Sequence, residues 1–75
     1  MNKARRKEIS RAIELMEQAR EILEAAMEEE QEAFDNLPES FQSSERGEAM
    51  EEYISTIEEA IDALDTDELQ EIVDG

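Results

Sequence analysis

Apolar residues recur every three or four positions over residues 3–34, which is the spacing of one face of an α-helix. No Gly or Pro interrupts this stretch, and strong helix formers dominate it. The pattern predicts a first helix over about residues 3–34. Its apolar stripe covers roughly half of the circumference, because Leu15 and Ile22 widen one edge, and such width is typical of a helix with two neighbours. The other members of the stripe are Ile9, Ala12, Ile13, Met16, Ala19, Leu23, Ala26, Met27, Ala33 and Phe34.

Residues 35–44 have the composition of a linker that contains a short helical turn. Pro38 disfavours helical geometry at the residue before it. Asn36 and Glu39 have the spacing of a capping box, which predicts that Asn36 caps the short turn. Ser44 is well suited to cap the start of a second helix.

The same helical spacing returns after the linker and predicts a second helix over about residues 45–73. We expect one continuous helix here, with a possible kink at residues 65–67, where Asp and Thr interrupt the apolar pattern. Its stripe comprises Ala49, Met50, Tyr53, Ile54, Ile57, Ala60, Ile61 and Leu64.

Two long helices joined by a short linker predict an all-α fold, an antiparallel helical hairpin that forms a single domain over residues 1–75. One hairpin cannot cover two wide apolar faces. We therefore expect a homodimer that forms a four-helix bundle, with docking onto another protein as the alternative. The residues expected to mediate self-association are Ile9, Ile13, Met16, Leu23, Met27, Ile54, Ile57, Ile61 and Leu64.

Charge is distributed unevenly along the chain. The sequence holds 23 acidic and seven basic residues, a formal net charge of −16, yet residues 1–11 carry five cations against Glu8 alone. Cations at the start of one helix and acids at the end of the other oppose both helix dipoles. Because an antiparallel hairpin brings these ends together, we expect Lys3, Arg5, Arg6 and Lys7 to pair with them within or between subunits. A contact with phosphate or with a partner is the alternative.

Acidic residues gather along each predicted helix. On the first helix they fall within roughly 80° of one another, and several are like-charged neighbours four residues apart, an arrangement that destabilises a helix by about 0.2–0.5 kcal/mol per pair. One interpretation is a solvated face. The other is a surface kept for its negative field, which attracts basic proteins and spaces carboxylates like the phosphates of a nucleic acid. The candidate partner-binding residues are Glu14, Glu17, Glu21, Glu24, Glu28 and Glu32, followed by Glu48, Glu51, Glu52, Glu58, Glu59 and Asp62.

The residue types that the chain lacks exclude several chemistries. The sequence has no Cys and no His, so it has no disulfide, no thiolate zinc site and no Glu-x-x-His di-metal site. Residues 65–67 lack the glycine and the final Glu of an EF-hand loop. No apolar run approaches the ~18–20 residues of a membrane span, and the negative charge disfavours nucleic acid as a direct ligand. We expect no enzymatic activity, no catalytic residue, no metal and no cofactor.

Four segments, Asn2–Lys7, Phe34–Gln42, Glu45–Glu51 and Ile57–Leu64, give the chain a resemblance to a known group. It resembles the small acidic helical proteins encoded by phages and prophages of Gram-positive bacteria. The resemblance implies a phage context, in which small acidic proteins antagonise host defence or DNA-binding proteins in the cytoplasm of the bacterial host cell. It transfers no functional residue.

These observations predict a non-enzymatic acidic interaction protein. In its most specific form it is a phage-encoded inhibitor that binds a basic nucleic-acid-binding or host-defence protein through the acidic residues above, as a mimic of nucleic acid. The alternative is a self-associating structural or adaptor coiled-coil module whose acidity serves only solubility.

Overall fold

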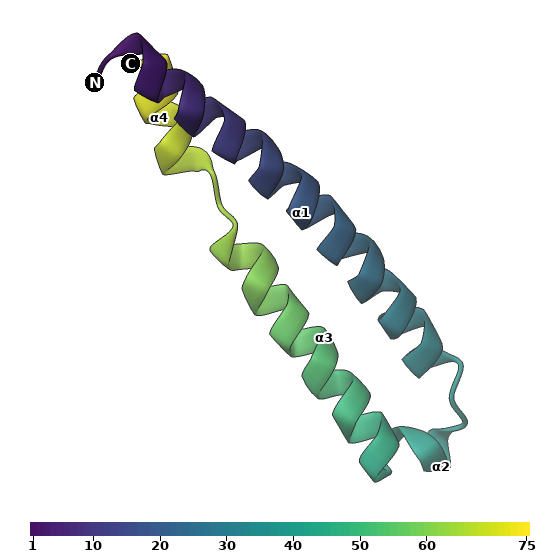
Figure 1. Ribbon diagram of the computed structural model, residues 1–75. Coiled ribbons are helices and arrows are strands. Elements are labelled where there is room, and N and C mark those ends of the chain that lie inside the picture. Colours follow the sequence, from purple (N-terminus) through teal and green to yellow (C-terminus); the bar gives the residue numbers. More distant parts are fainter.

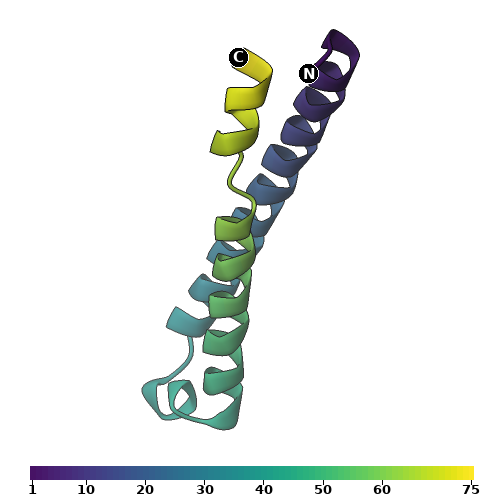
Figure 2. The same cartoon turned by 90° about the vertical axis from the view of Figure 1, so that its left-hand side faces the viewer.

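The computed structural model describes all 75 residues, Met1–Gly75, and contains four helices and no strand. They are α1 (Lys3–Asp35), α2 (Glu39–Gln42), α3 (Glu45–Ala63) and α4 (Asp67–Asp74). The all-α prediction is confirmed. Because α1 contacts both α3 and α4, the second half of the chain returns along the first (Figure 1). Both termini lie at the same end of the molecule in both views (Figure 2).

Side chains just outside the helices set where the two long helices begin. Asn2 accepts a hydrogen bond from the backbone N–H of Arg5 at 2.9 Å and caps α1. Ser44 caps α3 as predicted and accepts from the N–H of Gly47. The predicted capping role of Asn36 is wrong, because Asn36 ends α1 instead and donates its backbone N–H to the carbonyl of Glu32 at 3.0 Å. Position 36 thus completes the long helix rather than starting the short one.

The prediction of one continuous helix over about residues 45–73 is wrong. Helix α3 ends at Ala63, and α4 begins at Asp67. Between them, a side-chain oxygen of Asp65 accepts from the backbone N–H of Asp67 at 3.0 Å. Asp favours such local bonds over the helical ladder, which is why it terminates helices as well as capping them. The kink considered at residues 65–67 is therefore a complete break.

The molecule is a thin rod. Its principal extents are 58 × 14 × 13 Å and its radius of gyration is 17.5 Å, against about 11 Å for a compact domain of this length. Only Ile13, Met50 and Ile61 form the buried apolar core. Ile13 and Ile61 were predicted to bind a second copy, but the chain's own helices already shield them, and the other seven residues of that set are half-buried in the same way.

The connection between α2 and α3 depends on a buried glycine. A Cβ atom on Gly47 would lie 2.6 Å from the carbonyl oxygen of Phe41 and closer still to that of Gln42. Gln42 in turn donates from its amide to the backbone carbonyls of Phe34 and Leu37, at 3.3 and 3.1 Å, which ties α2 to the end of α1. A side chain at position 47 would push α3 away from this turn.

We predict that Gly47→Ala lowers the free energy of unfolding by about 1–3 kcal/mol, the usual cost of overpacking. Helix propensity alone favours Ala over Gly by about 1 kcal/mol, so the two effects have opposite signs. Thermal unfolding followed by circular dichroism measures the change. Ser55→Ala, at an exposed position of α3, is the control and should leave the melting temperature almost unchanged. A Gly47→Ala variant that is more stable than the parent would contradict the close approach of position 47 to the carbonyl groups of Phe41 and Gln42.

Candidate functional site

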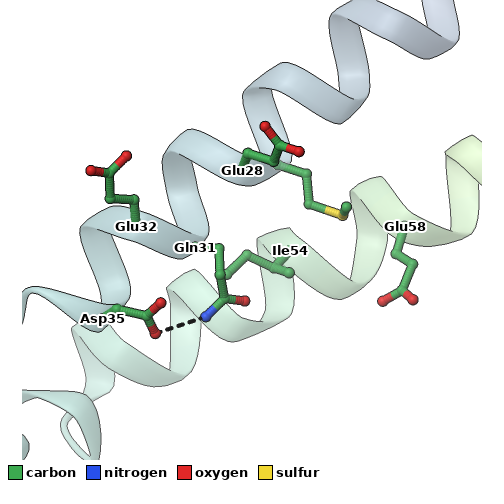
Figure 3. Close-up of a pocket in the computed structure, with 7 residues that line it drawn as sticks. Glu28, Gln31, Glu32, Asp35, Ile54 and Glu58 are labelled. Carbon is green, nitrogen blue, oxygen red and sulfur yellow. Dashed lines mark hydrogen bonds between the residues drawn. The ribbon is translucent and has the colours of Figure 1, made fainter.

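Carboxylates from two helices line one open groove between α1 and α3. The groove has a volume of about 350 Å³. Figure 3 shows Glu28, Glu32 and Asp35 on α1 and Glu58 on α3, with Ile54 between the helices. Met27 completes the apolar part of its lining. The groove therefore combines a small apolar floor with a rim of negative charge.

Gln31 is the groove residue that the sequence analysis missed. It lies 18 residues after Ile13, which is five full helical turns, so it points in the same direction as the core of α1. Its amide donates to Asp35 at 3.0 Å, as Figure 3 shows, which holds the carboxylate at the groove. A polar residue in phase with the buried face is the signal that could have identified this position. Gln31 is exposed and lines the groove with the carboxylates around it.

The structure places the predicted acidic residues on more than one surface. Glu28, Glu32 and Glu58 line the groove described above, and Glu48 and Glu51 line a second one of about 520 Å³ beside α2. Glu14, Glu17, Glu21 and Glu24 continue the α1 row toward the N-terminus, and Asp62 follows Glu58 along α3. Glu52 and Glu59 lie roughly 160–180° around α3 from the buried Ile61 and project away from α1. The acidic residues of α3 therefore do not form one ridge.

Few cations neutralise these carboxylates. The two ion pairs are Arg11 with Glu14 and Arg20 with Glu24, each at 3.2 Å and each within α1. Neither joins the basic N-terminal cluster to the acidic α4, although α1 and α4 are in contact. The expected pairing of these ends within one chain is thus not present as ion pairs. Eleven of the twelve predicted partner-binding acids are exposed and Glu24 is half-buried, so a negative surface faces the solvent.

Metal ligation is not built into this surface: no three carboxylates lie close enough together to hold an ion. None of the four helices combines the length and the apolar character that crossing a membrane requires. No protein-family model, curated protein or solved structure matches the chain. The groove and the faces of the helices are therefore the features on which a function can be argued.

We predict that salt stabilises this protein. Exposed like charges repel one another, and added NaCl shortens the distance over which they act, from about 30 Å at 0.01 M to about 3 Å at 1 M. Removing this repulsion should raise the melting temperature by about 4–8 °C, equivalent to about 1 kcal/mol in a domain of this size.

The matched variant is Glu21→Gln with Glu28→Gln, which interrupts the like-charged series Glu17, Glu21, Glu24, Glu28 and Glu32. It should melt at a higher temperature than the parent in low salt and respond less to NaCl. A melting temperature of the parent that falls as NaCl is added would show that the two ion pairs outweigh the repulsion.

Proposed function

We propose that this chain is a non-enzymatic acidic interaction protein that binds a basic nucleic-acid-binding or host-defence protein. The carboxylates of α1, together with Glu58 of α3, provide the contact surface. The observation that carries the proposal is the groove that Glu28, Glu32 and Glu58 line together with the apolar Met27 and Ile54. A basic side chain with a long aliphatic stem, Arg or Lys, matches both parts of such a groove.

The length and spacing of the acidic row support mimicry of nucleic acid. From Glu14 to Asp35 the row covers 21 residues of one straight helix, about 31 Å at 1.5 Å per residue. Its successive carboxylates lie ~5–10 Å apart, which is comparable with phosphates along a nucleic-acid backbone. The molecule is also elongated, with principal extents of 58 × 14 × 13 Å, so the acidic row lies along an extended surface. In this proposal it acts as a phage-encoded inhibitor in the cytoplasm of a bacterial host.

Self-association as a structural or adaptor module is the second candidate. In this proposal the chain forms an antiparallel hairpin, and two hairpins assemble into a four-helix bundle. The support is the small core: three apolar residues are buried, whereas Leu15, Ile22 and Tyr53 are exposed. The acidic surface would then provide solubility alone. The two candidates concern different surfaces, so one chain can have both properties.

We predict that reversing the groove side of α1, with Glu21→Lys, Glu28→Lys and Glu32→Lys, weakens binding of a basic partner by at least about tenfold. These side chains are exposed, so the helical content should not change. The partner is first captured from a bacterial lysate at about 50 mM NaCl, eluted with duplex DNA, and then titrated against each variant, because binding by phosphate mimicry is weakened by salt and by DNA.

The matched control is Glu45→Lys, Glu52→Lys and Glu59→Lys, which changes the net charge equally on the side of α3 that points away from α1. It should bind nearly as well as the parent. An equal loss of partner binding in both variants would show that net charge alone explains the effect. That result would contradict the proposal that the groove is the contact surface. Captured proteins that resist both DNA and salt, or no captured protein, would contradict mimicry of nucleic acid.

A further inference from the structure

An exposed apolar stripe runs along α1 on the side away from the acidic groove. Its alanines are spaced seven residues apart, and Leu15 and Ile22 share that spacing, three residues after an alanine in each case. Spacings that alternate between three and four residues are typical of the a and d positions of a coiled coil. We call the alanines together with Leu15 and Ile22 the alanine seam. In the single chain the seam has no neighbour, because Leu15 is 48% and Ile22 is 70% exposed. The alanines are Ala12, Ala19, Ala26 and Ala33.

Helix α3 presents a similar strip on the same face of the molecule. Around the axis of α1, the groove acids lie on one side of the buried Ile13, and the alanine seam lies on the other side. Around α3 from Ile61, Glu58 lies in one direction and Tyr53 in the other. Since the acids of both helices line one groove, the two apolar strips share the opposite face. Tyr53 is 60% exposed there, flanked by the small residues Ala49 and Ala60.

The chain exposes more surface than a compact monomer of its size. The chain exposes 5837 Å², whereas a compact monomer of its 8.6 kDa exposes about 4,700 Å². The excess, about 1,100 Å², exceeds the ~800 Å² that each partner contributes to a stable interface of standard size. A second copy stacked on the apolar face would remove an area of this order from water.

We propose that a second copy of this chain packs antiparallel on this apolar face, α1 against α1 and α3 against α3, and completes a four-helix bundle. The inference rests on the self-association proposed above and adds its surface and its orientation. It replaces the interface predicted from the sequence, whose residues face the chain's own helices. It is independent of the acidic groove, which stays open on the opposite face.

Large and small residues alternate so that the antiparallel seam interdigitates. In an antiparallel coiled coil, each a position of one helix lies opposite a d position of the other. Here the alanines occupy the a positions, and Leu15 and Ile22 occupy d positions. The resulting register places Leu15 opposite Ala26 of the second copy and Ile22 opposite Ala19. By the two-fold symmetry each of these layers occurs twice. Facing a large residue with a small one fills the space between helices and permits a close approach.

Charge selects the antiparallel orientation. In a parallel pair, Glu29, which continues the seam after Ile22, would face Glu29 of the second copy, and the two basic N-termini would lie together. In the antiparallel pair Glu29 faces Ala12, and the two basic N-termini lie at opposite ends of the α1–α1 contact.

The first test measures the oligomeric state of the full chain by sedimentation equilibrium at micromolar concentration. We expect the parent to be a dimer and the double variant Leu15→Gln, Ile22→Gln to be a monomer. Phe41→Gln removes an equally exposed large side chain from α2, outside the face, and should remain a dimer. A monomeric parent would overturn self-association itself. A double variant that stays dimeric would overturn this face while leaving self-association standing, and neither result bears on the acidic groove.

The second test determines the orientation with single cysteines, since the chain has none of its own. Ala12→Cys and Glu29→Cys are introduced into separate chains. In the antiparallel pair, two copies of position 12 lie about 26 Å apart, beyond the ~7 Å that a disulfide spans. We expect a cross-linked dimer when the two variants are mixed and oxidised, and none from Ala12→Cys alone. Cross-linking of Ala12→Cys with itself would establish the parallel pair and overturn the proposal.

Discussion

A structure two helices thick can bury only the line of side chains along which the helices touch. In this chain α1 meets α3 and then α4 along one such line, and Ile13, Met50 and Ile61 are the apolar residues that it buries. Every other apolar side chain remains at least partly in contact with water. The rod shape and the small core follow from this constraint, and so does the availability of both outer faces for contacts with other molecules.

The width of the apolar stripe on α1 explains how those faces differ. Helix α3 covers one part of the stripe, which leaves Leu15 and Ile22 uncovered at its edge. On the other side of the contact line the stripe gives way to carboxylates, and there Glu58 of α3 lines the same groove as Glu28, Glu32 and Asp35 of α1. The molecule therefore has an acidic face and an apolar face. A basic partner and a second copy could bind at the same time, because the two surfaces do not overlap.

Local features of the fold could be predicted from the sequence. Features that depend on competition between alternative hydrogen-bond partners could not. Ser44 was predicted as a cap because it is a strong hydrogen-bonding residue in front of a helical pattern, and the structure confirms it. Asn36 has the same chemistry, but the carbonyl of Glu32 binds its backbone N–H, so it serves the preceding helix. Asp65 accepts a hydrogen bond from the backbone N–H of Asp67 between the end of α3 and the start of α4, although apolar residues in phase with α3 continue beyond it.

The sequence by itself determined the helices and their amphipathic faces, because helix propensity and a period of 3.6 residues are properties of local segments. It also determined the negative charge of the surface and the absence of His and Cys chemistry. The tertiary structure alone decided which part of the wide stripe is covered, since that depends on the rotation of α1 and α3 about their axes. That rotation directs the residues first expected to bind a second copy toward the chain's own helices, leaves Leu15 and Ile22 exposed, and places Gln31 in the lining of the acidic groove.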